Sequence, residues 1–267
     1  MSRLFFSLVL YKQTFDDIYP LLMSIENLNN LYPDRVFLSI YDNTSTTIRF
    51  NKKKFSFLNF PVKYTHDQRN IGFGKANNRN FKNFLPSNND LFIISNPDTY
   101  FDANELKKFI DFFLDQKNIV CANPLIRNKD SSIQYSSKRN PTFLSLLLGF
   151  LPFLLRIKIL REYDLFHKNK DKDYVNQTFQ ANFLSGSFLV VKSNIFKKVG
   201  GFTDSYFLHL EDADLVRKCS LHGETAHLPK GEIIHTWNRG SHKSLFQISH
   251  IIRSMVIYFY IWGFKFI

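Results

Sequence analysis

The sequence predicts an α/β fold with a Rossmann-like, mostly parallel central sheet, flanking helices and an amphipathic helical segment at the C-terminal end. Three observations support this prediction. Short apolar runs bounded by turn residues recur along the first half, and segments of helical length separate most of them. Apolar residues make up 44% of the 267 residues, which is enough for a substantial core in one large domain.

The first half of the chain alternates between expected strands and expected helices. The expected strands are 4–11, 36–42, 62–64, 91–95 and 119–122. The expected helices between them are 15–29, 75–84 and 104–115. This alternation is typical of a parallel sheet with helices on its faces.

The second half has a less regular pattern. Residues 123–180 are basic and irregular around an apolar segment at 141–160, and the charged stretch 167–173 is predicted to be a mobile loop. Regular elements are then expected again: a strand within 183–192, a short helix ending at 200–201, a helix from the acidic cluster to about 222, a strand at 231–237 and a last helix.

Composition limits the possible partners and compartment. A net charge of +12 predicts attraction to polyanions such as nucleic acid, anionic lipid or a phosphate-bearing substrate. The two cysteines, Cys121 and Cys219, match no metal-binding spacing, and a reducing cytosolic compartment fits them best. No signal peptide is recognisable at the N-terminus. The apolar segments 141–160 and 244–267 contain charged residues, so we expect them to lie on a membrane or pack internally rather than cross it.

Polar loops follow three consecutive expected strands. They begin at Asp42-Asn43, at Asn70 with Gly72, and at Asn96-Pro97-Asp98. Because ligands bind at the carboxyl ends of parallel strands, these loops are expected to converge on one site. Each loop alone is also ordinary turn chemistry, and the glycine loop is not a dinucleotide fingerprint, because Asn77 stands where GxGxxG needs its third glycine.

Two further groups of residues suggest chemistry. Asp98 and His235 both follow strands, and a carboxylate with an imidazole suits Mn²⁺ or Mg²⁺, although a turn and a hydrogen-bonded histidine are the simpler alternatives. Glu211, Asp212 and Asp214 crowd into "LEDADL", where they are expected to cap a helix while one acts as a general base.

Six motifs, in order, resemble the family 2 inverting glycosyltransferases of GT-A fold, specifically the bacterial rhamnosyltransferase-like branch that builds O-antigen and related surface glycans. The motifs are "YDNTS", "NIGFGKANN", "NPDT", "FLSGSFLVVK", "GGFTDSYFLHLEDADLVRK" and "IIHTWNRGS". The resemblance covers roughly residues 4–255. Each motif is loose, and their shared order is specific.

The resemblance implies a nucleotide-sugar donor, a divalent cation (Mg²⁺ or Mn²⁺) and a single displacement that inverts the anomeric carbon. It implies that residues 1–122 are the nucleotide-sugar-binding half of a GT-A domain and that 123–243 are its acceptor-binding and catalytic half. Residues 244–267 are then a C-terminal amphipathic helix.

Matched by position, Asp212 is implied to be the catalytic base, with Glu211 beside it, and Asp98 and His235 to be the metal ligands. The implied nucleotide-sugar-binding residues are Tyr11, Asp42, Asn43, Asn70, Gly72, Phe73, Lys75, Asn77, Asn96, Ser185, Gly186, Arg239, Ser241 and Lys243. The basic loop that holds the last three suits a leaving diphosphate or is a solvated loop. Asn96 replaces the first acid of the family's DxD motif, so metal affinity is expected to be modest.

The expected function is transfer of L-rhamnose from dTDP-rhamnose to a polyprenyl-diphosphate-linked glycan on the inner face of the cytoplasmic membrane, by a peripheral enzyme with no nucleic acid partner. One alternative is a UDP-sugar-dependent transferase of galactose, galactofuranose or N-acetylglucosamine. Another is a non-catalytic basic protein that binds membrane or nucleic acid. A nucleotidyltransferase is disfavoured, because no extended glycine-rich loop follows the first strand.

Overall fold

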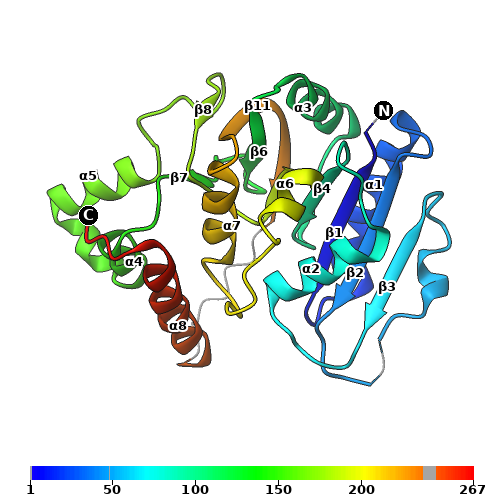
Figure 1. The fold of residues 1–267 in the computed structure, drawn as a ribbon, viewed down its shortest axis with the longest axis horizontal. Coiled ribbons are helices and arrows are strands. Elements are labelled where there is room, and N and C mark those ends of the chain that lie inside the picture. The colour runs from blue at the N-terminus through cyan, green and yellow to red at the C-terminus, as the bar shows by residue number, and fades with distance from the viewer. Residues whose placement is uncertain (1, 48, 237–244) are drawn as a thin grey trace.

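The computed structural model describes residues 2–47, 49–236 and 245–267. In this part of the chain a nine-stranded sheet forms the centre of the molecule, with the order β3-β2-β1-β4-β10-β6-β11-β5 and β8 paired to β11 (Figure 1). The strands are β1 Leu4–Leu10, β2 Val36–Asp42, β3 Val62–His66, β4 Leu91–Ser95, β5 Thr99–Tyr100, β6 Ile119–Arg127, β8 Phe179–Gln180, β10 Phe188–Lys192 and β11 Glu224–His235.

The register of the sheet confirms the mostly parallel arrangement. Strand β1 pairs in parallel with β2 and β4, β2 pairs in parallel with β3, and β6 with β11. Strand β10 is antiparallel to both of its neighbours, β4 and β6. The carboxyl ends of β1, β2, β3 and β4 therefore meet at one edge of the sheet, as the loop prediction requires.

Helices cover both faces of the sheet. Helices α1 (Phe15–Leu31) and α3 (Ala103–Asp115) bury their apolar residues against one face, together with Phe6 and Leu8 of β1. Helices α2 (Phe73–Phe84), α6 (Ser193–Lys198) and α7 (Glu211–Ser220) cover the other face, where Phe5 packs. Successive residues of β1 thus point to opposite cores, which explains why the strand is buried at every position and apolar at all of them except Ser7.

The remaining elements lie mostly in the second half of the chain and differ partly from expectation. They are η1 Lys52–Phe55, β7 Ser137–Lys138, α4 Phe143–Phe150, η2 Pro152–Arg156, α5 Lys158–His167, β9 Phe183–Leu184 and α8 Leu245–Trp262. The single strand expected within 183–192 is two strands, β9 and β10, because β9 leaves the main sheet to pair with β7. The stretch 168–173 after α5 is a loop, as expected, and it is anchored by Asn169, which is buried and donates from its side chain to the carbonyl of Ser137 (3.1 Å).

Helices α4, α5 and α8 lie together at one end of the molecule, remote from β3 (Figure 1). The chain after α8 pairs with the start of α4, where the N–H of Phe143 donates to the carbonyl of Lys265 (2.8 Å). One face of α8 packs against α7 through Tyr258, and Trp262 Nε1 donates to Asp214 Oδ1 (2.8 Å). Among the described residues, no helix is both long and apolar enough to span a bilayer.

Candidate active site

The loops after β1, β2 and β4 meet around a cavity of about 720 Å³ at the predicted edge of the sheet. Its lining includes seven residues that the sequence predicted to be in the site: Tyr11, Asn43, Asn70, Gly72, Phe73, Asn96 and Asp98. We call this space the donor cavity. The structure therefore brings together side chains from positions that are far apart in the sequence, as the topology of the sheet predicts.

Side-chain amides shape the loop that enters α2. Asn43 holds the loop from both sides, because its Nδ2 donates to the carbonyl of Gly72 (3.2 Å) and its Oδ1 accepts from the N–H of Ile71 (3.1 Å). Gly72 has a φ of 87°, and a Cβ there would lie 2.6 Å from the carbonyl oxygen of Phe207. Only glycine can adopt this φ and lie this close to the carbonyl of Phe207. Gly72 therefore determines the position of this wall of the donor cavity.

Five predicted nucleotide-sugar-binding residues that the structure describes do not line the donor cavity: Asp42, Lys75, Asn77, Ser185 and Gly186. Asp42 is fully buried, and its carboxylate accepts from Arg49 Nε (2.7 Å) and from the Tyr64 hydroxyl (2.9 Å). Burial acts to raise the pKa of Asp42, but hydrogen bonds from Thr44 and Arg49 outweigh it and hold the pKa below its usual value. The Asp42 carboxylate therefore already has its hydrogen-bond partners within the protein.

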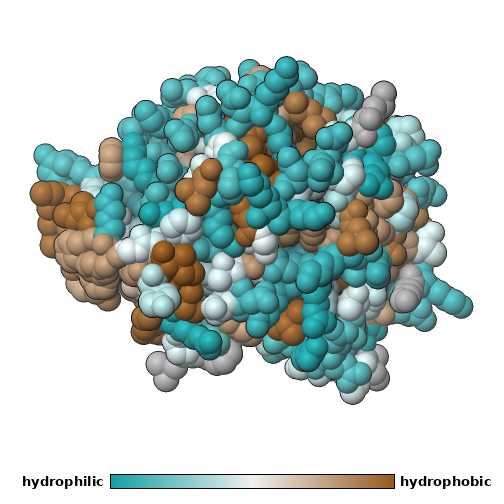
Figure 2. Space-filling model, viewed as in Figure 1, coloured by the Kyte–Doolittle hydropathy of each residue, from teal (hydrophilic) through white to brown (hydrophobic). Residues whose placement is uncertain are grey.

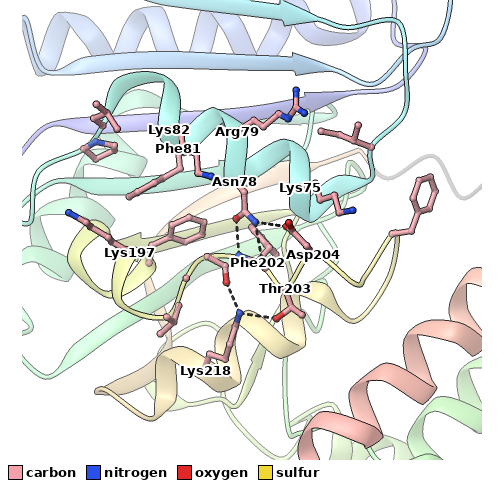
Figure 3. Close-up of a pocket in the computed structure, with 18 of the residues that line it drawn as sticks. Lys75, Asn78, Arg79, Phe81, Lys82, Lys197, Phe202, Thr203, Asp204 and Lys218 are labelled. Atoms are coloured by element: carbon pink, nitrogen blue, oxygen red, sulfur yellow. Dashed lines mark hydrogen bonds between the residues drawn. The ribbon is translucent and has the colours of Figure 1, made fainter.

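Asn77 and Lys75 also lie outside the donor cavity. Asn77 is buried under the sheet, where Ser7 Oγ donates to its Oδ1 (2.5 Å) and its Nδ2 donates to the carbonyl of Phe73 (3.0 Å). Lys75 faces a different and larger cavity of about 1260 Å³ on the outer side of α2 (Figure 3).

The larger cavity lies beside a set of contacts that join α2 to α7. Figure 3 shows the Asn78 amide bonded to the backbone of Phe202, with N···O distances of 2.8 and 2.9 Å, and Lys218 Nζ donating to the carbonyl of Gly201 (2.6 Å). Neither Asp98 nor Asp212 lines it. Although this cavity is the larger one, we do not assign the reaction to it. The hydrogen bonds beside it hold the loop before α7 against α2.

Asp98 and His235 face each other, as the sequence predicted, with Oδ1 and Nε2 3.2 Å apart. His235 is buried, and its Nδ1 lies 2.9 Å from Gln134 Oε1. The orientation of the Gln134 amide is fixed, because its Nε2 donates to Asn128 Oδ1 and to the carbonyl of His235. Oε1 can only accept, so the ring donates from Nδ1, and in the neutral ring Nε2 then carries the lone pair.

This geometry fits a divalent cation. A lone pair on Nε2 and a carboxylate oxygen repel at 3.2 Å unless a proton or a cation lies between them. A histidine whose other nitrogen donates to a fixed amide is the usual arrangement around a metal ligand. Within the described residues, no third His, Cys, Asp or Glu completes a metal-binding group.

Glu211 and Asp212 open α7 beside a second cavity, of about 660 Å³. Asp212 Oδ2 accepts from the N–H of Gly186 (2.9 Å), and its Oδ1 accepts from the N–H of Ala213 (2.9 Å). Glu211 is buried, and its Oε2 has no hydrogen-bond partner among the described residues. The expected capping holds in part: the N-cap position is Leu210, which has a φ of 63° and no side-chain bond, but Asp212 accepts from the first-turn N–H of Ala213.

The two carboxyl groups share an environment that disfavours two charges. Burial, followed by the charge of Asp212, raises the pKa of Glu211 to about 8. Burial also raises the pKa of Asp212, but hydrogen bonds from Gly186 and Ala213 and the charge of Lys138 oppose that shift. Hydrogen bonds to the ionised form favour it, so the proton belongs on Glu211 and the negative charge on Asp212.

Ser185, Gly186 and Ser187 form the turn between β9 and β10 and line this second cavity. A Cβ on Gly186 would lie 3.3 Å from Asp212 Cβ and 3.3 Å from Phe73 Cε1, so the turn is packed against the carboxylate. The two cavities share Phe73, Asn96 and Leu208 in their linings. The cavity with Asp212 therefore adjoins the donor cavity with Asp98.

The sequence analysis missed several residues of the site. Gln134 orients His235, and the second cavity is lined by Lys138, Asp164, His167 and Lys168 from β7 and the end of α5. No motif or characteristic spacing identifies these residues, because they lie in the segment 123–180, which was predicted to be irregular. Arg239, Ser241 and Lys243 lie outside the described residues.

The fold and the site define an α/β protein of the GT-A type, with polar loops at the carboxyl ends of its parallel strands and a carboxylate on an adjoining helix. The chain belongs to glycosyl transferase family 2, whose sequence profile matches residues 14–200. That match covers more than half of the chain.

Two curated relatives are similar in sequence over part of their length. The chain is 27% identical over 179 residues to an N-acetylglucosaminyl-diphospho-decaprenol L-rhamnosyltransferase of Mycobacterium tuberculosis, covering 62% of this chain and 56% of the relative. It is 25% identical over 170 residues to rhamnosyltransferase WbbL of Escherichia coli K12, covering 61% of this chain and 60% of the relative. The aligned regions thus span little more than half of each relative.

Solved structures support the fold. The structure of GalNAc-T7 with UDP, GalNAc and Mn²⁺ superposes with a TM-score of 0.67 at 13% identity, covering 96% of this chain and 48% of that one. Mannosyltransferase PcManGT of Pyrobaculum calidifontis, in complex with GDP-Man and Mn²⁺, superposes with a TM-score of 0.60 at 13% identity, covering 97% and 64%. At these identities the similarity defines the fold alone.

Proposed function

We propose that this protein is an inverting glycosyltransferase that moves a sugar from a nucleoside-diphosphate donor to a hydroxyl acceptor. The observation that carries the proposal is that two cavities adjoin at Phe73 and Asn96. One contains a carboxylate suited to be a base, and the other is lined by Asp98, which lies 3.2 Å from His235. Inversion needs the base and the leaving diphosphate on opposite sides of one sugar, and adjoining cavities offer that arrangement.

The proposed step is a single displacement. The acceptor hydroxyl gives its proton to the Asp212 carboxylate as its oxygen forms a bond to the anomeric carbon. The bond from that carbon to the diphosphate oxygen breaks, and its electron pair leaves with the diphosphate. Protonated Glu211 keeps a second negative charge away from Asp212. In this proposal residues 1–122 supply most of the donor side and residues 123–243 most of the acceptor side.

Asp98 and His235 are the proposed ligands of a divalent cation. When bound, Mg²⁺ or Mn²⁺ would neutralise charge on the leaving diphosphate. The remaining ligands would come from the substrate and from water, which is usual for a cation that binds beside phosphates. Two related folds were solved with Mn²⁺, which supports this part of the proposal.

L-Rhamnose from dTDP-rhamnose is the proposed donor, because both curated relatives are rhamnosyltransferases. A UDP-sugar is the second candidate, since a UDP complex exists for a protein of the same fold. The proposed acceptor is a glycan on a polyprenyl diphosphate, by analogy with the N-acetylglucosaminyl-diphospho-decaprenol named for the mycobacterial relative.

A lipid-linked acceptor agrees with an exposed apolar surface at the end formed by α4, α5 and α8. Figure 2 shows hydrophobic residues gathered there, and the solvent-exposed ones include Phe153 (60%), Ile159 (71%) and Val256 (65%). Exposed cations lie among them: Arg156, Lys158, Arg161, Arg253 and Lys265. We propose that this membrane surface, as we call these residues, rests on an anionic bilayer in the cytoplasm.

A panel of nucleotide sugars tests the proposed function. Each donor is added with Mn²⁺, with Mg²⁺ or with a chelator, and both the melting temperature and slow donor hydrolysis are measured. A donor that raises the melting temperature and is hydrolysed only with a cation is the expected result. The proposal fails if no donor produces a shift or hydrolysis under any metal condition.

A further inference from the structure

The second cavity contains a cluster of cationic side chains that takes no part in the proposed proton transfer to Asp212. Lys138 extends from β7, and Lys168 lies just beyond the end of α5, and both line the cavity beside Asp212. Among the described residues the Lys138 ammonium has no ion-pair partner, and it lies 5.1 Å from the centroid of the Phe183 ring. Burial, followed by the charge of Lys168, lowers the pKa of Lys138. An anion bound beside both ammonium groups would offset this repulsion.

The cavity also holds an unused hydrogen-bonding group. His167 is buried, and its Nε2 has no hydrogen-bond partner among the described residues. Burial, followed by the charge of Lys138, lowers the pKa of His167 to about 4, so the ring is neutral at physiological pH. A buried polar nitrogen without a partner is expensive, which suggests that a ligand normally satisfies it.

The wall of the cavity on the other side is apolar. It is built by the inner faces of α4 and η2, through Leu146, Leu148, Phe150, Pro152 and Leu155. The outer faces of the same segment carry the exposed residues of the membrane surface. A ligand bound here can therefore place a charged group at Lys138 and an apolar chain along α4 and η2.

The anion that Lys138 and Lys168 bind is not the diphosphate of the donor. Inversion requires the leaving diphosphate to lie across the sugar from the base, and Asp98, the contact partner of His235, lines the other cavity. Lys138 lies on the side of the base, close enough that its charge lowers the pKa of Asp212. An anion in this cavity must therefore belong to the acceptor.

We infer that Lys138 and Lys168 bind the diphosphate of a lipid-linked acceptor sugar, with His167 Nε2 accepting from a hydroxyl of that sugar and α4 and η2 holding the first part of its lipid chain. The inference rests on the proposed function and adds the residues that select a charged acceptor. Lys168 also pairs with Asp164 (2.6 Å), which orients its ammonium within the cavity. Lys138 is then the cation most available to the ligand.

Binding of farnesyl diphosphate, a soluble isoprenoid diphosphate, tests the inference. Calorimetry with chelator present compares the wild type with Lys138→Met and Lys138→Arg. We expect Lys138→Met to weaken binding roughly 10- to 100-fold, as loss of a charged hydrogen bond does. Lys138→Arg should retain most of the affinity, and farnesol should bind the wild type far more weakly than its diphosphate. Lys129→Met removes an exposed lysine elsewhere and should change nothing.

Donor binding and donor hydrolysis are measured on the same variants, because they report on the proposed function separately. Lys138→Met should leave the donor-induced shift in melting temperature intact, whereas transfer to a diphosphate-linked acceptor should be lost. If Lys138→Met does not fold, Lys168→Met provides the same comparison. Equal affinity of the wild type for farnesol and farnesyl diphosphate, or unchanged binding by a folded lysine variant, would overturn the inference even if nucleotide sugars bind.

Discussion

Asp212 and Glu211 are neighbours in the chain, yet their surroundings give them different protonation states. Asp212 accepts two backbone N–H bonds, whereas Glu211 has an oxygen with no partner among the described residues. Ionising both would place two like charges side by side in a buried site. The arrangement supplies one ionised carboxylate at the mouth of the second cavity, which a general base requires.

Asp212→Asn should lower sugar transfer by roughly 10²- to 10⁴-fold, because an amide cannot take the hydroxyl proton. The amide has nearly the same size and can still accept one of the backbone bonds, so donor binding should persist. Turnover with donor and acceptor is measured beside the donor-induced shift in melting temperature. Asp34→Asn, at an exposed left-handed position that asparagine tolerates, is the matched control. Turnover of Asp212→Asn close to that of the control would contradict the assignment.

Glu211→Gln should stabilise the protein in alkaline solution and not in acid. The pKa of Glu211 is about 8 in the folded protein against 4.5 for an ordinary glutamate, so the folded state binds the proton more tightly. That contribution to stability is complete below about pH 4.5 and is lost as pH rises through about 8. Glutamine is neutral throughout, so the melting temperature of the variant should match the wild type near pH 5 and exceed it near pH 9.

The control for this comparison is Glu162→Gln, which removes an exposed carboxylate on α5. Its melting temperature should differ from the wild type by a small amount that does not grow with pH. A constant difference between Glu211→Gln and the wild type over the whole range would show that Glu211 is not the buried protonated member of the pair.

Single residues also show where prediction from sequence stops. Tyr11, Asn70, Asn96 and Asp98 were predicted correctly as neighbours, because topology alone places strand ends together. Asp42 has the same sequence signal, but its lone pairs are used by Arg49 and Tyr64, which the sequence does not reveal. Whether a polar side chain at a strand end remains available depends on partners that arrive from elsewhere in the chain.

At the scale of elements, the entry to α2 controls the shape of the donor cavity. Gly72 approaches the backbone of Phe207 so closely that the N–H of Phe73 donates to the same carbonyl (3.2 Å). The loop after β3 and the segment before α7 are therefore fixed to each other. A change in this contact should move the donor loop and the base helix together.

Gly72→Ala should abolish donor binding and lower the melting temperature. Its backbone has a φ of 87° and a ψ of 166°, which is a region open almost only to glycine and costs other residues roughly 1–3 kcal/mol. The new methyl would also collide with the carbonyl of Phe207, 2.6 Å away. Gly149→Ala inside α4 is the control, because its Cβ meets nothing within 4 Å. Donor binding by Gly72→Ala equal to that of the control would exclude this role.

Prediction of the elements succeeded where the pattern was local. Residues 15–29, 75–84 and 104–115 are helical because apolar residues recur on one face and a cap such as Asp102 begins the helix. Prediction failed at 183–192, where pairing of β9 with β7 decides the structure, and it did not foresee that Asn169 anchors the loop at 168–173. Both depend on partners far away in the chain.

At the scale of the molecule, the sheet edge, the two cavities and the membrane surface form one continuous path. The donor cavity adjoins the second cavity at Asn96, and the second cavity is walled by α4 and η2. The outer side of α4, η2 and α5 is the membrane surface (Figure 2). An acceptor anchored in a bilayer could therefore reach Asp212 without leaving the lipid.

The protein should bind anionic vesicles through this surface. Phosphatidylglycerol vesicles should retain it in a flotation assay, and neutral phosphatidylcholine vesicles should not, because each cation near an anionic surface contributes about 1 kcal/mol. Raising the salt concentration should weaken the binding as the charges are screened.

Phe153→Ser with Ile159→Ser should reduce retention at least 10-fold, since each buried apolar side chain contributes about 1.5–3 kcal/mol. Leu85→Ser removes an exposed leucine at the far end of α2 and should have no effect. Equal retention of the double variant and the Leu85 control would place the membrane contact elsewhere on the protein.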